Sequence, residues 1–198
     1  MSEVEMRENP VAAGKSSFNL IDAVKLFLEL RLQKNSVFLD LACGNGSYAI
    51  AASDYIGKQG KIYAFDLWRE GIDSLRREAA ARRIKNIHAE VADINEAIPV
   101  DDNSIDVCLM ATVLHDLVEE KTESGTLRQV GRVLKPHGLL AIIEFNKVDG
   151  KPGPPVQIRI SPAELEHILA PYGFRPVKTV EVGQFNYLSI FQKARRIE

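Results

Sequence analysis

An aspartate and two glycines lie at the end of an apolar run in the first quarter of the chain. Residues 37–46 read VFLDLACGNG, so Asp40 is followed at short range by Gly44 and Gly46. Glycines between a strand and a helix let a ligand approach the backbone and reach the amide groups at the helix N-terminus. The segment therefore predicts a ligand site at the end of a strand, with a simple tight turn as the alternative.

Two kinds of ligand fit this segment. Residues 44–49 match the G-x-G-x-x-A pattern of dinucleotide-binding domains, and Asp66 lies at about the spacing expected for a ribose contact. An NAD(P)-binding oxidoreductase is therefore one interpretation. Asp40 favours the other, because a carboxylate at the end of the first strand would repel a pyrophosphate. S-adenosyl-L-methionine (AdoMet) carries an ammonium and a sulfonium group and no phosphate, so it would be attracted.

The elements that must position these residues are alternating strands and helices. Strands are predicted at residues 36–41, 61–66, 87–91, 105–113 and 139–145, and helices from Ser47, at 70–83 and at 122–134. Asn19 is expected to cap an earlier helix with an apolar face formed by Leu20, Ile21, Val24, Phe27 and Leu28. Strands that are apolar on both faces indicate a parallel sheet covered by helices on each side.

The C-terminal part of the chain breaks this alternation. A helix is predicted at 162–172, and two strands at 176–182 and 185–192 are separated only by Gly183 and Gln184. Two strands joined so tightly must be antiparallel. We therefore expect a single α/β domain over residues 1–198, with a Rossmann-like, doubly wound sheet of seven strands. The sheet should be mostly parallel, with one antiparallel strand near the C-terminus.

Five segments in order resemble the class I AdoMet-dependent methyltransferases. LDLACGNG resembles their D/E-x-G-x-G-x-G signature, and the others are FDL at 65–67, ADI at 92–94, DVCLMATVLHDL at 106–117 and GRVLKPHGLLAIIEF at 131–145. The last is similar to the RVLKPGG segment of small-molecule methyltransferases, including those of quinone biosynthesis. The chain departs from the family at Ala42, where a glycine is common, and at His137, which replaces a glycine of KPGG.

The resemblance, which covers roughly residues 35–193, implies a division of the domain. Residues 1–34 would form an N-terminal arm and helix, 35–146 the cofactor-binding half, and 147–198 a substrate loop and C-terminal hairpin. The cofactor would be AdoMet and the product S-adenosyl-L-homocysteine (AdoHcy). The residues implied to bind the cofactor are Asp40, Ala42, Gly44, Gly46, Asp66, Leu67, Asp93, Ile94 and Ala111.

Several of these residues take a definite role from the resemblance. Asp40 would orient the methionyl ammonium, directly or through water, and Asp66 would accept both ribose hydroxyls. Leu67 would pack against the adenine, and Asp93 would accept a hydrogen bond from its exocyclic amine, with Ile94 adjacent. Ala111 and Thr112 would lie near the transferred methyl group. A helix cap for Asp66 and a turn for Asp93 are the structural alternatives.

His115 is the candidate for a general base, which the reaction needs only if the acceptor must lose a proton. It follows the fourth strand, and Asp116 stands beside it as a possible orienting partner. A histidine that caps or packs at a helix start is the alternative. Glu144, near the end of the fifth strand, is expected to contact the substrate or to make a structural hydrogen bond.

The acceptor is predicted to be a small molecule. No N-P-P-[YF] sequence follows the fourth strand, which disfavours methylation of exocyclic DNA amines or of a glutamine amide. Ala111 and Thr112 stand where the catechol-type metal site has carboxylates, so no metal site is predicted. The loop at 146–160 with Arg159 and the N-terminal arm with Lys15 are expected to cover the substrate. A non-catalytic AdoMet-binding protein remains an alternative, together with the oxidoreductase.

The composition limits the partners. A net charge of −2 and a pI near 6.1 provide no electrostatic attraction for nucleic acid. No apolar run is long enough to cross a bilayer, so no integral membrane segment is expected. The two cysteines, Cys43 and Cys108, lie in apolar strands, which favours a reduced thiol state and a cytoplasmic location.

Overall fold

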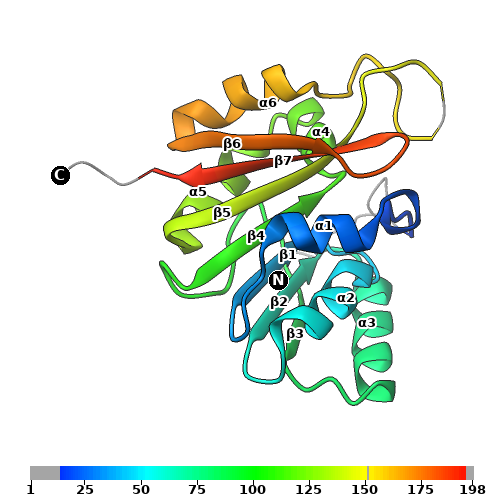
Figure 1. The fold of residues 1–198 in the computed structure, drawn as a ribbon, viewed down its shortest axis with the longest axis vertical. Helices are drawn as coiled ribbons and strands as arrows, with labels where there is room; N and C mark the ends of the chain where they lie inside the picture. Colours follow the sequence, from blue (N-terminus) through cyan, green and yellow to red (C-terminus); the bar gives the residue numbers. More distant parts are fainter. Residues whose placement is uncertain (1–13, 151, 195–198) are drawn as a thin grey trace, which may run out of the picture.

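A mixed seven-stranded sheet in the order β3-β2-β1-β4-β5-β7-β6 organises the domain (Figure 1). The computed structural model describes residues 14–150 and 152–194. The strands are β1 (Val37–Leu41), β2 (Lys61–Asp66), β3 (Ile87–Val91), β4 (Ile105–Ala111), β5 (Leu134–Phe145), β6 (Phe174–Glu181) and β7 (Asn186–Lys193). β7 runs antiparallel to both of its neighbours, β5 and β6, whereas the other pairings are parallel. The predicted fold class is confirmed.

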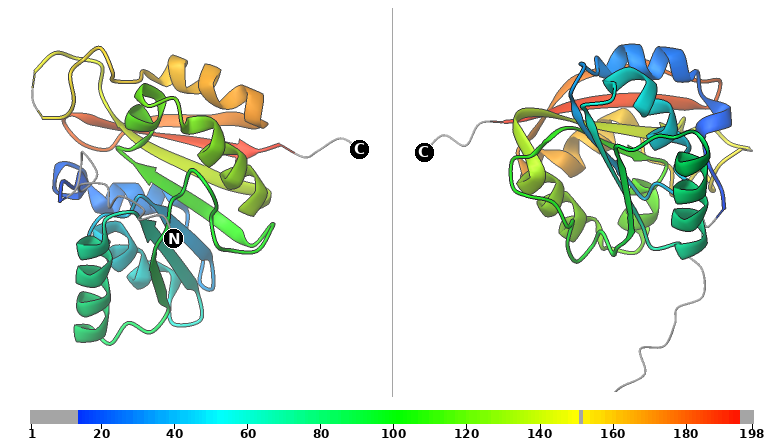
Figure 2. Two further views of the ribbon diagram at one scale, coloured as in Figure 1. Left: turned by 180° about the vertical axis from the view of Figure 1, so that it is seen from behind. Right: turned by 90° about the horizontal axis from the view of Figure 1, so that it is seen from below.

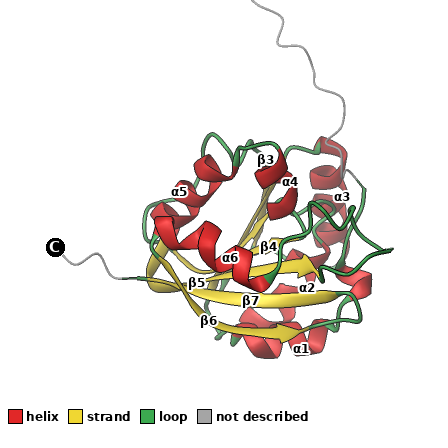
Figure 3. Ribbon diagram, turned by 90° about the horizontal axis from the view of Figure 1, so that it is seen from above, coloured by secondary structure: helices red, strands yellow, loops and turns green. Residues whose placement is uncertain are grey.

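Helices cover both faces of this sheet. The helices are α1 (Ala23–Leu30), α2 (Ser47–Ile56), α3 (Arg69–Ala81), α4 (Leu114–Glu119), α5 (Glu123–Val133) and α6 (Pro162–Leu169). One core cluster joins α1, α2 and α3 to the sheet, and a second joins α4, α5 and α6 to its other face. Figures 2 and 3 show α1 and α6 on opposite sides of the C-terminal strands. The sheet is therefore buried on both sides, as its apolar strands predict.

The strand order reverses between β1 and β4. From β1 the chain winds outward through β2 to β3, then crosses to β4 on the other side of β1 and continues to β5. The carboxyl ends of these parallel strands meet at one edge of the sheet. In open α/β sheets this edge, at the reversal point, is where ligands bind.

The N-terminal helix differs from its prediction. Phe18–Leu20 form a separate short 3-10 helix, and α1 begins only at Ala23, where the Asp22 side chain accepts the Lys25 backbone N–H at 2.9 Å. The expected cap, Asn19, is exposed and makes no such bond. The buried side chains of α1 are Leu26, Phe27 and Leu30, whereas Val24 and Leu28 face outward. The prediction was wrong because two capping residues precede this helix, and packing against the sheet selects the later one.

The fifth strand is also longer than predicted. β5 begins at Leu134 and includes the Pro136-His137-Gly138 turn. Its pairing with β4 jumps from Ile105↔Leu134 to Val107↔Leu139, so the turn bulges out of the strand. His137 takes a left-handed φ of 65°, a conformation that a glycine adopts more easily.

The remaining elements follow their predictions closely. Boundaries at β1, β2, β3 and α3 agree within two residues, whereas the short helix α4 was not predicted as a separate element.

Over the part of the chain that the structure describes, no helix combines the length and the apolar character needed to span a bilayer.

Candidate functional site

The residues after β1 and β4 are strained. Ala42 and Thr112 both have a φ of 54°, a left-handed conformation that costs free energy for any residue with a Cβ and most for a β-branched one. Thr112 is held there by its backbone N–H, which donates to the Ile143 carbonyl at 2.7 Å, and by its hydroxyl, which donates to the Ala111 carbonyl at 2.8 Å. The strain lies at the reversal point of the sheet, and strained backbone is concentrated at functional sites.

The glycine loop joins β1 to α2 at this edge. Gly44 and Gly46 have φ values of 56° and 77°, which suit glycine. A Cβ on Gly46 would lie 2.4 Å from the Leu75 side chain, so this glycine also allows α3 to pack closely against the loop. The Cys43 backbone N–H donates to the Phe65 carbonyl at 3.1 Å and ties the loop to β2.

Asp66 holds the loop from the end of β2. Its carboxylate accepts the Gly44 N–H and the Trp68 N–H, each at 2.7 Å, and its partial burial raises its pKa. A carboxylate has about four acceptor positions, so this one can accept further hydrogen bonds from a ligand. Asp66 therefore combines the predicted ligand-facing position with a structural role in the loop.

Asp40 lies beneath the glycine loop and is only 1% exposed. One carboxylate oxygen accepts the Ala49 N–H at 3.0 Å, in the first turn of α2. Burial raises the pKa of Asp40 to about 8, and the negative charge of Asp66 adds to the increase. Among the described residues neither carboxylate forms an ion pair. Two adjacent carboxylates without a cationic partner fit a cofactor that brings its own positive charge.

The residues expected around the adenine differ in their exposure. Leu67 follows Asp66 and keeps about half of its surface exposed, so it is available for a ring. Asp93 forms the turn that was its alternative role, since one oxygen accepts the Asn95 N–H at 2.9 Å. Ile94 is buried and belongs to the same core cluster as Phe65. Ala111 lies half-buried at the end of β4.

His115 and Glu144 form a buried pair. The His115 Nδ1 lies 2.7 Å from Oε2 of Glu144, and the His115 backbone N–H donates to Oε1 at 3.2 Å. His115 is 5% exposed and Glu144 is 0% exposed. Burial opposes the charged imidazole, but the hydrogen bond and charge of Glu144, helped by Asp116, raise the pKa of His115 overall.

This geometry corrects two expectations. Glu144, rather than Asp116, orients the imidazole, because Asp116 Oδ1 lies 3.5 Å from Nε2 while Glu144 makes the short contact. Glu144 does not face an acceptor, since both of its oxygens are used by His115 and its side chain is fully buried. The expected structural hydrogen bond is the role that the geometry supports for Glu144.

A groove of about 310 Å³ lies beside His115, between α4, the 146–160 segment and α6. We call it the His115 groove. Its apolar walls come from Val118, Ile158, Ile160 and Ile168, and its polar rim includes Lys147 and Glu164. The groove therefore combines an apolar wall with several polar and charged side chains, which also include Glu119, Gln157 and His167. Small-molecule sites use apolar walls for burial and polar groups for orientation.

Arg159 does not serve as a free substrate contact. It is 3% exposed, and its guanidinium donates to backbone carbonyls of its own loop. A guanidinium has five N–H donors and all five are used within the loop, so Arg159 has no donor left for a substrate. The prediction that the 146–160 loop covers the substrate stays a prediction.

The described end of the N-terminal arm lies over the glycine loop. Ser17 is buried, and its hydroxyl contacts the Tyr48 hydroxyl at 2.8 Å and the Thr112 hydroxyl at 3.2 Å. The Lys15 carbonyl faces Gly44, whereas the Lys15 side chain is exposed. These residues cover the glycine loop rather than the His115 groove. The rest of the predicted arm, residues 1–13, lies outside the described residues.

Sequence reasoning missed Gly71, which supports the loop from α3. A Cβ at this position would lie 2.5 Å from the Gly44 carbonyl oxygen and 2.3 Å from Cε3 of Trp68. A glycine inside a predicted helix is unfavourable by about 1 kcal/mol, which was the available signal for a packing constraint. Ser17 and Tyr48 were also missed, and nothing in their local sequence marks them.

Replacing Gly71 with alanine is expected to weaken AdoHcy binding by at least about tenfold, because the added methyl group must displace the Gly44 backbone. Isothermal titration calorimetry with AdoHcy measures the change. Gly131→Ala in α5 is the control, since a Cβ there meets nothing within 4 Å and should stabilise the helix by up to about 1 kcal/mol. Unchanged AdoHcy affinity in Gly71→Ala would show that the loop tolerates the displacement.

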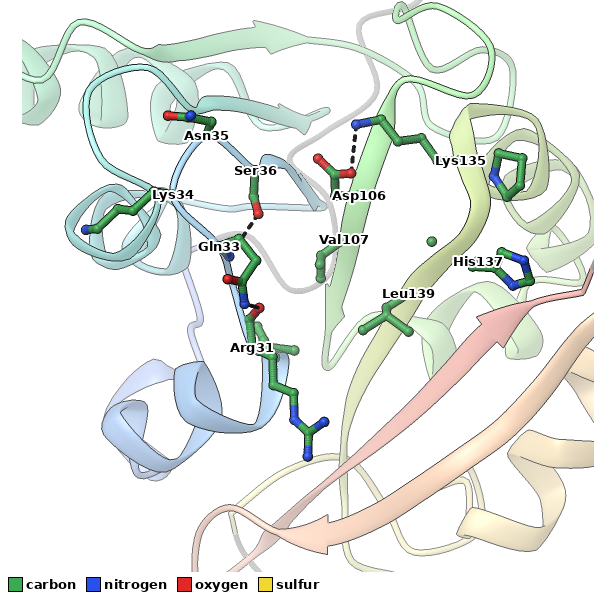
Figure 4. A pocket seen from close by; sticks show the side chains of 13 residues that line it. Arg31, Gln33, Lys34, Asn35, Ser36, Asp106, Val107, Lys135, His137 and Leu139 are labelled. Carbon is green, nitrogen blue, oxygen red and sulfur yellow. Dashed lines mark hydrogen bonds and ion pairs between the residues drawn. The ribbon is translucent and has the colours of Figure 1, made fainter.

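A larger pocket, of about 510 Å³, lies at the opposite edge of the sheet (Figure 4). Its residues come from the turn after α1 and from the amino ends of β4 and β5. Figure 4 shows the charged ends of Arg31 and Lys34 on separate sides of this pocket, while Lys135 binds Asp106 at 2.7 Å. These groups do not converge, and the pocket is remote from the carboxyl ends of the strands, so it is not the candidate site.

The same fold occurs in proteins with different activities. The chain superimposes on the crystal structure of the [4+2]-cyclase SpnF with a TM-score of 0.71 at 17% identity, covering 87% of this chain and 79% of that one. At this identity the likeness shows the fold alone, and the activity must be argued from the site.

Curated relatives include quinone-pathway enzymes. The chain is 27% identical over 119 residues to demethylmenaquinone methyltransferase of Staphylococcus epidermidis, covering 60% of this chain and 46% of the relative. It is 31% identical over 113 residues to the ubiquinone/menaquinone biosynthesis C-methyltransferase UbiE of Idiomarina loihiensis, covering 55% of this chain and 42% of the relative. The chain therefore spans about half the length of the curated relatives it matches.

Two comparisons cover most of the chain. A family model described as a methyltransferase domain matches residues 32–195. The crystal structure of a SAM-dependent methyltransferase from Aquifex aeolicus superimposes with a TM-score of 0.81 at 31% identity, covering 90% of this chain and 93% of that one. Together with the reversal-point glycine loop, these matches show that the chain belongs to the class I AdoMet-dependent methyltransferases.

Proposed function

We propose that this protein transfers the methyl group of AdoMet to a small-molecule acceptor bound in the His115 groove. The observation that carries the proposal is the joint position of two sites at one edge of the sheet. The carboxylates of Asp40 and Asp66 lie at the glycine loop, and the buried His115–Glu144 pair lies beyond the neighbouring strands β4 and β5. One site suits a cationic cofactor, and the other suits an acceptor that gives up a proton.

The cofactor supplies a methyl group that is already activated on a sulfonium. The chain therefore has to bind the cofactor and the acceptor, align the acceptor with the methyl group, and exclude water. Asp66 has acceptor capacity left for the ribose hydroxyls, and Leu67 offers apolar surface for the adenine. Asp40 would place its negative charge beneath the methionyl part. With Glu144 accepting the Nδ1 proton, His115 Nε2 has a free lone pair that can take a proton from the acceptor.

Calorimetric titration with AdoHcy, AdoMet and NADH tests the cofactor. We expect AdoHcy and AdoMet to bind and NADH not to bind, because a pyrophosphate would meet the carboxylates at the glycine loop. Asp66→Ala should abolish AdoHcy binding, whereas Asp54→Ala, at an exposed position on α2, should leave it unchanged. Binding of NADH without AdoHcy would favour the oxidoreductase interpretation.

Transfer of a radiolabelled methyl group to a panel of small acceptors tests the reaction. The panel contains 1,4-naphthohydroquinone, catechol, an aliphatic thiol and an aromatic amine, so that it covers oxygen, carbon, sulfur and nitrogen nucleophiles. The named activity of the quinone-pathway relatives supports trying the hydroquinone first. AdoMet binding without transfer to any class of acceptor would favour a non-catalytic AdoMet-binding protein.

A further inference from the structure

The guanidinium of Arg159 is surrounded by backbone carbonyls from one loop. Its Nε donates to Pro154 at 2.8 Å, its Nη1 to Asn146 at 3.0 Å and Val148 at 2.7 Å, and its Nη2 to Gly150 and to Pro152 at 3.0 Å. We call these five oxygens the carbonyl ring. They belong to alternate residues, so the loop turns every second carbonyl inward, and the five donors of the guanidinium are saturated.

This arrangement is a buried cation without an ion pair among the described residues. Arg159 is 3% exposed, and the Phe145 ring lies 5.6 Å from its Cζ, within cation–π range. Removing a charge from water is costly unless dipoles or opposite charges replace the water. The carbonyl ring and Phe145 provide that replacement, so loop and side chain stabilise each other in one conformation.

Two glycines allow the loop backbone to curl around the guanidinium. Gly150 and Gly153 have φ values of 100° and 102°, which residues with a Cβ rarely adopt. A Cβ on Gly153 would lie 2.7 Å from the Phe145 ring, so the loop also packs directly on the end of β5.

The carbonyl ring connects the loop to the His115 groove. Lys147 precedes Val148 of the ring and lines the groove, while Ile158 and Ile160 flank Arg159 and form its apolar wall. The Ile160 carbonyl accepts the Tyr187 hydroxyl at 2.6 Å, which ties the same wall to β7. On the other side, the edge of the Phe145 ring faces the His115 ring at a centroid distance of 6.4 Å. Movement of the carbonyl ring would therefore displace the groove wall formed by Ile158 and Ile160, which lies opposite His115.

We infer that Arg159 is a positioning residue for methyl transfer, and that its guanidinium holds the carbonyl ring so that the groove wall keeps the acceptor against His115. The inference rests on the proposed function, since it assigns the acceptor to this groove. Arg159 also lines the groove, but the loop carbonyls use all of its guanidinium donors, so it acts on the acceptor through the loop. It therefore sets the binding of the acceptor and leaves the binding of the cofactor unchanged.

Arg159→Lys is the main variant, because lysine keeps the charge but has at most three donors for five carbonyls. Arg159→Ala removes both, and the cavity it leaves can admit methylguanidinium as a soluble replacement. Arg128→Lys on the exposed face of α5 is the matched control. Three measurements are made on each protein: amide hydrogen exchange at residues 146–150, AdoHcy affinity by calorimetry, and KM and kcat with the panel acceptor that the wild type methylates fastest.

We expect Arg159→Lys to lose exchange protection at 146–150, to keep AdoHcy affinity within about twofold, and to raise the acceptor KM by about tenfold to 100-fold. Its kcat should change less than its KM. Methylguanidinium should restore protection and KM in Arg159→Ala and have no effect on Arg128→Lys.

Three results would overturn the inference. Unchanged exchange at 146–150 would show that the loop does not depend on Arg159. An equal loss of AdoHcy affinity and acceptor binding would show a general effect on folding. Lost protection with an unchanged acceptor KM would place the acceptor elsewhere. If the wild type binds AdoHcy but methylates no acceptor, the proposed function and the catalytic part of the inference both fail, whereas the exchange and rescue results still decide whether Arg159 holds the ring.

Discussion

His115→Gln is expected to lower the rate of methyl transfer by about 100-fold to 10,000-fold for an acceptor that must lose a proton. Glutamine can still donate a hydrogen bond to Glu144, so the buried carboxylate keeps a partner, but it cannot accept a proton from the acceptor. AdoHcy affinity should stay within about threefold, since His115 lies outside the glycine loop. Single-turnover kinetics with labelled AdoMet measure the chemical step directly.

The pH profile separates a base from a packing residue. In the wild type the rate should rise with pH through the pKa of His115, which Glu144 raises above its ordinary value despite burial. Glu144→Gln removes the negative charge, so the midpoint should move to lower pH while the plateau rate falls, because the imidazole becomes a weaker base. In His115→Gln the rate should recover above the pKa of the acceptor, where no base is needed.

His88→Gln is the control for these variants, since His88 is exposed on β3 and stacks on Tyr63. A wild-type rate in His115→Gln at neutral pH would refute the base. It would leave His115 as the buried partner of Glu144, which was the structural alternative at the start of a helix.

Asp40→Asn is expected to make the protein more stable and to weaken its cofactor binding at the same time. Burial raises the pKa of Asp40 to about 8, compared with 3.8 for an ordinary aspartate. Between about pH 4 and pH 8 the unfolded chain therefore loses this proton while the folded protein keeps it, so the free energy of unfolding falls as pH rises. Above the folded pKa both states are ionised, and the decline from this group ends.

Asparagine stays neutral, so it removes this decline and still accepts the Ala49 N–H. The stability difference between variant and wild type should be near zero at pH 4 and grow by up to about 1.4 kcal/mol per pH unit, reaching about 2–4 kcal/mol at pH 7. AdoHcy affinity should fall by about tenfold to 100-fold, the value of one charge-assisted hydrogen bond. Urea denaturation over a pH series and calorimetry measure the two effects.

Proton release on binding gives an independent test of Asp40. The ammonium group of AdoHcy should lower the pKa of a neighbouring carboxyl, so the wild type should release more protons on binding AdoHcy at pH 7 than Asp40→Asn does. Titrations in buffers of different ionisation enthalpy report this number. Asp54→Asn on the exposed face of α2 is the control. A variant that is less stable at pH 7 and binds AdoHcy normally would reduce Asp40 to a support for α2.

The fold was predictable because its main signals are local. Each parallel strand is a continuous apolar run, and each helix between strands has its own periodicity, so alternation alone indicates a covered parallel sheet. The orientation of β7 followed from the short connection to the preceding strand, predicted as two residues and observed as four. The start of α1 was not predictable in this way, because Asn19 and Asp22 are both good caps and only packing of Leu26, Phe27 and Leu30 on the sheet decides between them.

The positions of the residues predicted to bind the cofactor follow from the sequence for a similar reason, whereas their binding role stays a prediction. Asp40, Gly44 and Gly46 lie within one strand, turn and helix, and Asp66 ends the next strand. The amino-acid sequence by itself determined the sheet and its glycine loop and predicted the sign of the ligand charge, since residue type and short spacing are enough for these features.

Only the tertiary structure decided which residues meet at the proposed acceptor site. His115 and Glu144 are 29 residues apart in the chain and meet because β4 and β5 are adjacent and end at the same edge. Arg159 was predicted only as part of a loop that covers the substrate, and the structure shows that this loop uses all of its donors internally. A side chain's partners depend on which distant segments pack against it, and this is the information that residue type and local spacing do not contain.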